Sequence, residues 1–308
     1  MKKILLLLAV SLLLSCSGKN TALPAVQTDP KIQYIAQYTG TTDVSITNSF
    51  ESGFESADDF SGYFTVPQNH MGTASHELSQ DNIYGGNFAH KGWIYGANTV
   101  IDGTNTNHRG YPTVQMYKDK GVFSGPVFIE LMVWLDIALE EMENKNWFSF
   151  VTLCTYSDDS WYRVITANIS YNHNLHLFHV PNQGEHVIDI YENDAIAFPM
   201  RQWVKITMLV DFSSQNQYSS PYAKLWQDGV LVSAATFNPR INPPADSALW
   251  PACLSGWDGN DVADAESMCS LTYEHGLAQA HFGLYAAPLL SSGTAYNDNL
   301  KIYELLYH

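Results

Sequence analysis

The stretch that decides the fold is WVKITMLVDF (Trp203–Phe212), YAKLWQDGVLV (Tyr222–Val232), AHFGLYA (Ala280–Ala286) and TAYNDNLKIYEL (Thr294–Leu305). In the first segment every second residue from Val204 to Phe212 is apolar, which is the pattern of a strand with one face in a core. Asp228-Gly229 divides the second segment, and Asp-Gly between two apolar runs is a strong hairpin signal. These segments predict antiparallel strands joined by tight turns or polar loops.

Similar short segments fill the chain upstream. They are Ser45–Glu51, Phe88–Ile94, Tyr111–Lys118, Val127–Asp136, Trp147–Cys154, Trp161–Ile169, Leu175–Val180 and Val187–Tyr191. No long helical period interrupts them, and the one helix-like stretch, Leu135–Asn144, is interpreted as a loop with a single turn. Many short strands without intervening helices predict an all-β fold, an antiparallel β-sandwich in one domain spanning residues 43–308. The long loop Asn238–Gly276 has the length of a functional loop.

The order of the closing strands resembles that of concanavalin A-like jelly-roll proteins. Within that fold, FPMRQWVKITMLVDF, AKLWQDGVLV, HFGLYA and YNDNLKI resemble the heparin lyase I and glucuronan lyase group of polysaccharide lyases. The resemblance implies a two-sheet sandwich that binds or cleaves a polysaccharide on one face. The arginine-glutamate-leucine and glutamine-isoleucine-histidine signatures of alginate lyases are not present, which argues against alginate as the substrate.

The N-terminus reads as an export signal. MKKILLLLAVSLLLSC has two lysines and an apolar run that is too short for a mature transmembrane helix. Leu13-Leu14-Ser15-Cys16 resembles a bacterial lipobox, which implies that Cys16 is lipidated and anchors the protein to a membrane of the cell envelope. The alternative is an ordinary signal peptide of a secreted protein with an incidental cysteine. We expect residues 1–16 to be signal peptide and lipobox, and residues 17–42 to be a flexible tether.

Charge and cysteine content narrow the partners. The formal net charge is −16, which argues against nucleic acid because nucleic-acid binding needs a basic surface. We expect a monomer whose partner is a polysaccharide, an acidic one if the lyase resemblance holds. Cys253 and Cys269 bracket one loop at a spacing that suits a disulfide in an exported protein. Cys154 is predicted to be a buried thiol.

The jelly-roll resemblance also implies a structural calcium site. In such sandwiches a carboxylate from a Phe-Glu-x-Gly strand and an Asp on the closing strand often hold calcium together. The matching residues here are Glu51 and Asp298, with Gly86 or Asn87 nearby. The alternative is two solvated carboxylates. No cofactor is expected for catalysis.

The first candidate site is His108-Arg109-Gly110-Tyr111-Pro112-Thr113-Val114-Gln115-Met116-Tyr117-Lys118. If Val114 and Met116 face the core, then Tyr111, Gln115 and Tyr117 share the opposite face. Tyrosine offers a sugar both a ring surface and a hydroxyl. Arg109 and Gln115 suit the neutralisation of a uronate carboxylate, and Tyr111 or Tyr117 suits proton transfer. His108 and Lys118 flank the stretch as substrate-binding candidates, and the alternative is a polar face without a ligand.

Three other groups are candidates. His176 and His179 could move protons, although a strand would place them on opposite faces, where they are poor co-ligands for a metal. Glu130, Trp134 and Asp136 share one strand face, but their spacing is not that of jelly-roll glycosidases. The third group, Tyr222, Lys224 and Trp226, could form a sugar platform or merely an amphipathic strand.

Three functions remain open from the sequence. The first is a polysaccharide lyase that cleaves a uronate-containing chain by β-elimination. The second is a non-catalytic glycan-binding lipoprotein that uses the same aromatic residues without a proton-transfer pair. The third is a glycoside hydrolase that uses Glu130 or Asp136, because hydrolysis requires two carboxylates at a defined separation.

Overall fold

The structure is a computed structural model. It describes residues 29–57, 70–71, 73–99, 107–115, 123, 125–138, 147–157, 160–169, 173–180, 188–211, 222–236 and 277–308. The elements in chain order are α1 (Pro30–Thr39), β1 (Val44–Ser52), β2 (His70–Met71), β3 (Ala74–Ser79), β4 (Ala89–Ile94), β5 (His108–Gly110), β6 (Thr113–Gln115), β7 (Val127–Ile137), β8 (Phe148–Ser157), β9 (Ser160–Ile169), β10 (Asn174–Val180), β11 (Ile188–Ala197), β12 (Trp203–Asp211), β13 (Tyr222–Gln227), β14 (Val230–Thr236), β15 (Leu277–Ala286) and β16 (Gly293–Tyr307).

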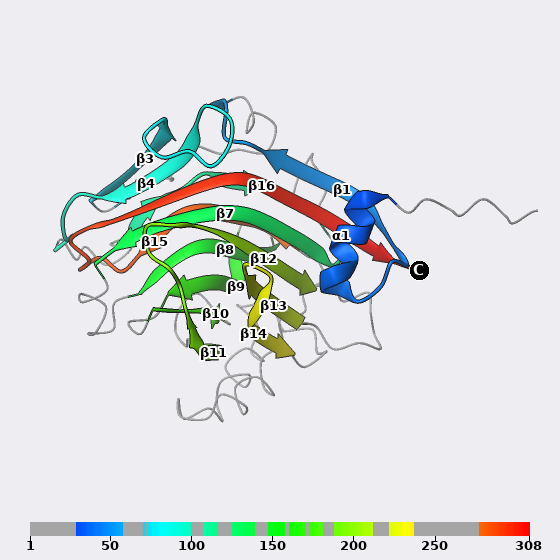
Figure 1. The fold of residues 1–308 in the computed structure, drawn as a ribbon. Coiled ribbons are helices and arrows are strands. Elements are labelled where there is room, and N and C mark those ends of the chain that lie inside the picture. The colour runs from blue at the N-terminus through cyan, green and yellow to red at the C-terminus, as the bar shows by residue number, and fades with distance from the viewer. Residues whose placement is uncertain are drawn as a thin grey trace, which may run out of the picture.

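The strands form two antiparallel sheets with bowed strands (Figure 1). Sheet A has the order β14-β13-β12-β7-β16-β4-β3, and β1 also pairs with β16. Sheet B has the order β11-β10-β9-β8-β15-β5-β2, and β6 also pairs with β15. The predicted all-β antiparallel sandwich is confirmed. Each sheet combines strands from both ends of the chain, so any surface on it gathers residues distant in sequence.

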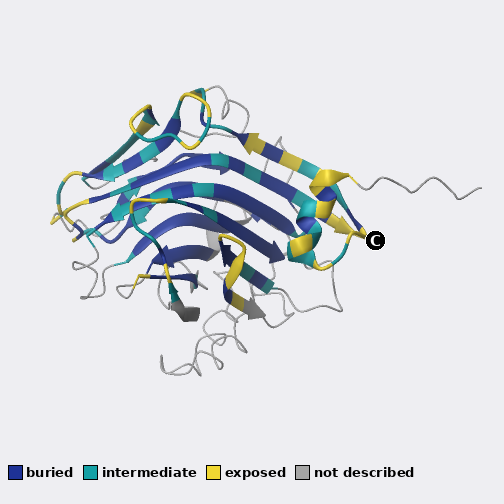
Figure 2. Cartoon of the chain, viewed as in Figure 1, coloured by how far each residue is buried: buried dark blue, intermediate teal, exposed yellow. Residues whose placement is uncertain are grey.

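The core lies between the sheets and follows the period-two pattern. Val127, Ile129, Leu131, Val133 and Leu135 of β7 are all fully buried and meet the apolar side chains of sheet B. The central strands are dark along most of their length in Figure 2, whereas exposed residues gather in the turns, in β1 and on α1. The remaining positions of each strand therefore form the two outer faces of the sandwich, where sites can be built.

Two details of the strand prediction differ from the structure. Of the predicted strand Tyr111–Lys118, residues 113–115 form β6, which pairs with β15, and residues 116–118 lie outside the described ranges. β5 precedes the predicted strand and also pairs with β15. β5 and β6 keep one register with β15 and are separated at Pro112, which has no backbone N–H to donate to the ladder. The predicted loop at Leu135–Asn144 is wrong at its start, because β7 continues to Ile137. Residues 139–146 lie outside the described ranges.

The tether predicted for residues 17–42 is wrong over residues 30–39, which form helix α1. The Asp29 carboxylate accepts the Lys31 amide at 2.8 Å, Pro30 occupies the first turn, and Gly40 ends the helix with φ of 78°. These are ordinary start and stop signals. Ile32 and Ile35 are buried against Phe128, Leu209 and Leu305 on the outer face of sheet A. The polar composition of the segment concealed this short apolar stripe.

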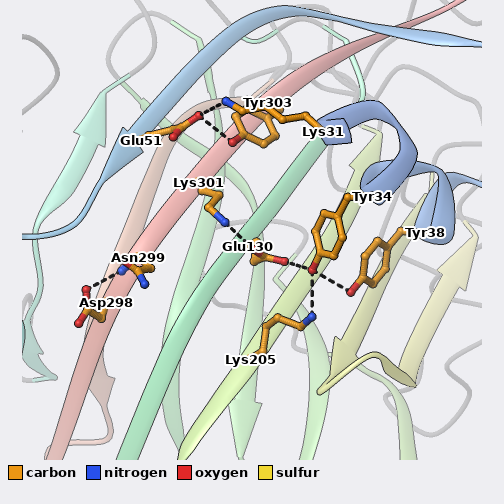
Figure 3. Close-up of polar contacts among 10 residues, drawn as sticks. All are labelled: Lys31, Tyr34, Tyr38, Glu51, Glu130, Lys205, Asp298, Asn299, Lys301 and Tyr303. Atoms are coloured by element: carbon orange, nitrogen blue, oxygen red, sulfur yellow. Dashed lines mark hydrogen bonds and ion pairs between the residues drawn. The ribbon is translucent and has the colours of Figure 1, made fainter. Parts of the chain in front are cut away.

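A polar network lies beneath α1 (Figure 3). Tyr34 donates a short hydrogen bond to the Glu130 carboxylate, which also pairs with Lys301 at 2.9 Å. The Lys205 ammonium donates to the Tyr34 hydroxyl at 2.9 Å. Burial and these neighbours raise the pKa of Tyr34 well above its usual range, so its proton stays in place. The network fixes α1 to the sheet by directional contacts as well as by apolar packing.

Replacing Tyr34 with Phe should lower the free energy of unfolding by about 1–2 kcal/mol, because the buried Glu130 loses one hydrogen-bond donor. Tyr38→Phe is the matched control, since the Tyr38 hydroxyl lies 3.2 Å from that of Tyr34 at the edge of the network. Urea unfolding of both variants measures the difference. Equal stability of Tyr34→Phe and the unaltered protein would mean that the polar network adds nothing to the attachment of α1, which apolar packing alone would then hold.

Three predictions for the chain lie outside the described residues. They are the signal peptide and lipobox at residues 1–16, the lipidation of Cys16, and the disulfide between Cys253 and Cys269. Cys154 is buried, as predicted. Within the described ranges, no helix has both the length and the apolar character needed to span a bilayer.

Candidate functional site on the outer face of sheet B

Polar and aromatic residues line up in two rows across the outer face of sheet B. The strand register joins Arg109, Tyr285, Ser149, Asn168 and His176 into one row, and Thr113, His281, Thr152, Thr166 and Phe178 into the next. The residues that flank His281 and Tyr285 along β15, such as Phe282 and Leu284, belong to the core. Side chains that alternate with core residues face away from it. The rows therefore form a continuous polar face of the sheet, although seven of their ten residues are buried.

The rings are packed most closely around Arg109. The Tyr111 and His281 rings stack with centroids 4.3 Å apart and planes at 11°. Tyr285 meets Tyr111 edge-on at 6.1 Å, and Trp147 meets Tyr285 at 4.7 Å. The Arg109 guanidinium lies 5.6 Å from the centroid of the Tyr285 ring. Arg109, Tyr111, His281 and Tyr285 are called the arginine cluster below.

Burial sets the protonation states in the arginine cluster. It lowers the pKa of His281 well below its usual value, and the positive charge of Arg109 lowers it further. Burial also raises the pKa of Tyr111 well above the usual value, against a smaller opposing effect of Arg109. At neutral pH the cluster therefore presents a neutral imidazole, a protonated phenol and a guanidinium. A base, an acid and a fixed cation are the groups required for proton abstraction beside a carboxylate.

A close approach between the sheets holds the arginine cluster in place. Gly110 follows Arg109 and precedes Tyr111, and its carbonyl oxygen lies 2.2 Å from where a Cβ on Gly92 would stand. Gly283, between His281 and Tyr285, has φ of 141°, and a Cβ there would come within 3.0 Å of Tyr111 Cβ. Because these glycines have no side chain, the backbones of β4, β5 and β15 can come into direct contact.

The structure brings together only part of the predicted first site. Arg109 and Tyr111 lie in the arginine cluster, and Val114 is in the core, as predicted. Gln115 pairs with Gln279 through the backbone, but the side chain of Gln115 is not among those that the structure describes. Tyr117 and Lys118 fall outside the described ranges. His281 was not among the residues predicted from the sequence. The alternation in AHFGLYA could have identified it, because it puts His281 on the strand face that Phe282 does not occupy.

His108, predicted to bind substrate, is a structural residue instead. It is fully buried, its Nδ1 accepts the Thr73 amide at 3.3 Å, and its Nε2 lies 3.0 Å from the Leu290 carbonyl oxygen. With both ring nitrogens engaged inside the protein, it is not available to a ligand.

The predicted histidine pair does not join the arginine cluster. His176 shares the outer face of sheet B, but four strand spacings separate it from Arg109, about 19 Å. That distance is too long for both residues to act on one sugar carbon. His179 lies on β10, and its side chain lies outside the description.

Most of the other candidates lie on the opposite side of the sandwich. Glu130, Trp134, Tyr222, Lys224 and Trp226 all belong to sheet A. Trp226 is buried and packs edge-on against Tyr38 of α1 at 5.2 Å, so the predicted sugar platform on β13 is wrong for this residue. The sequence could not show which strands belong to sheet A and which to sheet B, because strands of both sheets have the same alternation of apolar and polar residues.

The carboxylates of β7 are poorly placed for hydrolysis. Glu130 is buried beneath α1 and paired with Lys301, while Asp136 pairs with Arg201 at 3.0 Å. Six residues of an extended strand separate them by about 20 Å, beyond the roughly 6.5–9.5 Å of an inverting pair.

The proposed metal residues are not neighbours in the structure. The Glu51 carboxylate contacts Lys31 at 2.8 Å and the Tyr303 hydroxyl at 2.7 Å (Figure 3). Glu55, four residues later, accepts the Asn87 amide at 3.0 Å, and a Cβ on Gly86 would collide with its carboxylate. Asp298 accepts the amides of Tyr84 and Gly85 at 3.0 Å. The pair that meets at the 84–87 turn is therefore Glu55 and Asp298.

Two like charges meet at this turn. Burial raises the pKa of Asp298, and the negative charge of Glu55 adds to the rise. Within the described residues, no group of three or more His, Cys, Asp or Glu side chains is arranged to hold a metal. A cation here would therefore need backbone oxygens or water as further ligands, which calcium accepts.

The buried histidines predict an acid-sensitive fold. Burial lowers the pKa of both His90 and His281 well below the usual value. In the unfolded chain both imidazoles bind a proton below about pH 6.5, whereas in the folded protein they stay neutral at that pH. The free energy of unfolding therefore falls as the pH drops below about 6.5. Each ring should contribute a slope of about 1 kcal/mol per pH unit, measured by urea unfolding between pH 7 and pH 5. A free energy of unfolding that does not change between pH 7 and pH 5 would contradict the burial of His90 and His281 in their neutral form.

The comparisons with known proteins agree with the fold. No protein-family model matches the chain, and the search of curated proteins found no match. Among solved structures, the chain is similar to the cellulose-induced protein Cip1, with a TM-score of 0.50 and 13% identity over 82% of this chain and 95% of that one. It is also similar to an endo-β-1,4-glucuronan lyase from the fungus Trichoderma reesei, with a TM-score of 0.50 and 11% identity over 84% and 95%. At these identities the similarity establishes the jelly-roll sandwich.

Proposed function

We propose that the protein is a polysaccharide lyase that cleaves a uronate-containing chain by β-elimination at the arginine cluster. The observation that carries the proposal is the stack of neutral His281 on protonated Tyr111 within the electrostatic reach of Arg109. The similarity to a glucuronan lyase supports the substrate class. The acidic chain as a whole would repel a polyanion, so a local cation such as Arg109 has to bind the carboxylate.

In the proposed reaction, Arg109 pairs with the uronate carboxylate and stabilises the charge that develops when the C5 proton leaves. His281 takes that proton, and the C5–H electrons form the C4–C5 double bond. The C4–O bond breaks, and Tyr111 donates its proton to the departing glycosidic oxygen. No water is consumed. The raised pKa of Tyr111 keeps its hydroxyl protonated, and the lowered pKa of His281 keeps its imidazole in the neutral form that can accept a proton.

A panel of soluble polyuronates tests this function. The purified protein should release products with the ultraviolet absorbance of an unsaturated uronate from at least one member. His281→Gln should lose that activity while keeping the fold, judged by near-ultraviolet circular dichroism. New reducing ends without the absorbance would indicate hydrolysis and would overturn the proposal.

A second candidate is a glycan-binding protein without catalysis. Tyr111 and His281 are each only 3% exposed, and this alternative needs no proton transfer by either ring, because the partly exposed Arg109 and Tyr285 can contact a glycan without them. Binding of a polyuronate without any product, abolished by Arg109→Ala, would support it over the lyase.

We also propose that the 84–87 turn binds a structural calcium ion through Glu55 and Asp298. A cation would relieve the repulsion that helps to raise the pKa of Asp298. Millimolar calcium should raise the melting temperature by several degrees, and Glu55→Gln should abolish the rise. Glu51→Gln is the matched control, because Glu51 pairs with Lys31 instead. An equal calcium effect in both variants would place the ion elsewhere.

A further inference from the structure

A row of aromatic residues crosses the outer face of sheet A. Trp203 of β12 pairs with Trp134 of β7, Trp134 pairs with Tyr296 of β16, and Tyr296 pairs with Lys91 of β4. These strands are neighbours in the sheet, so the row runs straight across them for three strand spacings, about 14 Å. The row lies on the face opposite the arginine cluster.

The rings contact one another in pairs, and Tyr296 between them is only 6% exposed. Trp134 and Tyr296 meet at 5.3 Å and 84°, and Tyr84, which is 52% exposed, meets Trp203 at 5.8 Å. The Lys91 ammonium lies 5.4 Å from the centroid of Trp93 and 5.7 Å from that of Tyr296. Tyr84, Trp93, Trp134, Trp203 and Tyr296 are called the aromatic row below.

The outer face of sheet A has two parts that differ in polarity. Near α1 the outward residues are Phe128, Leu209 and Leu305, and the helix covers them with Ile32 and Ile35. The apolar part of the outer face of sheet A is therefore covered by a helix of the same chain. In the aromatic row, the outward neighbours are instead Asp136, Thr294 and Met132, and the 84–87 turn packs beside the row with Tyr84 against Trp203. Rings separated by hydrogen-bonding groups suit a ligand that has both C–H faces and hydroxyls.

We propose that the aromatic row is a second glycan-binding surface that holds a neutral polysaccharide chain. The charges around it select against a polyanion. Lys91 pairs with Asp81 at 2.5 Å and lies 3.9 Å from Glu77, and Arg201 pairs with Asp136. Three carboxylates against two cations leave this surface without surplus positive charge. A neutral chain can lie on the rings without that repulsion, while the paired side chains offer donors and acceptors to its hydroxyls.

Together with the lyase activity proposed above, on which this role rests, the aromatic row gives the molecule two carbohydrate-binding faces. The sheet B face would act on a uronate, and the sheet A face would hold the protein on a neutral glycan of the same matrix. The two faces can be tested separately, so failure of one is distinguishable from failure of the other.

Native affinity electrophoresis measures the binding. Gels containing hydroxyethylcellulose, laminarin or galactomannan should retard the protein in at least one case, and a polyuronate gel without turnover serves as the charged probe. Trp134→Ala combined with Trp203→Ala should weaken neutral-glycan binding at least tenfold, since stacking contacts dominate such sites. Tyr84→Ala, at the exposed rim, should weaken it less and should fold normally.

Two controls separate the faces. Arg109→Ala should keep neutral-glycan binding, and the aromatic-row variants should keep activity on soluble uronate. Tyr307→Ala, an exposed aromatic at the far end of β16, should bind like the unaltered protein. The proposal is overturned if no neutral probe retards the protein. It is also overturned if Tyr84→Ala and the double variant bind as before, or if the row proves to be a self-association surface by sedimentation velocity.

Discussion

Arg109→Ala should reduce turnover of a uronate polymer by a factor of about 10²–10³, comparable to the loss of a preorganised oxyanion donor. The guanidinium is the cation in electrostatic contact with both His281 and Tyr111. Without it, the charge that develops beside the carboxylate has no counter-charge. Arg109→Lys should recover part of the loss, because it restores the charge without the planar fork.

The matched control is Arg201→Ala, which removes an arginine that is 72% exposed and paired with Asp136 on the other sheet. Its turnover should stay within about twofold of the unaltered protein. Comparison of kcat and KM separates the roles, since a loss in kcat marks transition-state stabilisation. Full activity of Arg109→Ala would move the chemistry away from the arginine cluster.

Gly92→Ala should destabilise the fold by about 3 kcal/mol, at the upper end of overpacking effects. The new Cβ would stand 2.2 Å from the Gly110 carbonyl oxygen and 3.0 Å from Leu284 Cβ. Both are inside contact distance, and one is backbone, so the two sheets would have to separate locally. The shift would move Arg109 and Tyr111, which flank Gly110, and activity should fall together with stability.

Gly96→Ala is the control, because a Cβ there meets nothing within 4 Å. It should change the free energy of unfolding by less than about 0.5 kcal/mol. Thermal unfolding measures both variants, with an expected drop of roughly 6–12 °C for Gly92→Ala and almost none for Gly96→Ala. Equal melting temperatures would show that the sheets can yield at this contact without cost.

The fold was predictable because its strands carry strong local signals. Period-two alternation in β7, β12 and β16 and the Asp228-Gly229 turn each give the local structure without reference to the rest of the chain. β3 (Ala74–Ser79) was missed because ASHELS contains few β-branched or aromatic residues. Helix α1 was missed because its apolar stripe is short and becomes meaningful only against sheet A.

The site was only partly predictable, because it depends on pairing between distant strands. Alternation shows that Arg109, Glu130 and Trp134 each face outward, but it does not show which sheet each strand joins. The register of β15 with β5 and β6 brings His281 to Tyr111, some 170 residues away in sequence. Glu55 was passed over for Glu51 for a similar reason, since the turn that selects between them is made by residues 84–87.

The most direct test of the central claim is the mass of the products released from a polyuronate by the purified protein. β-Elimination consumes no water, so the fragments that carry the new non-reducing end should be lighter by one water molecule than hydrolytic fragments of the same length. His281→Gln should release none of them. Fragments with hydrated ends, or unsaturated fragments that persist undiminished in His281→Gln, would contradict elimination at the arginine cluster.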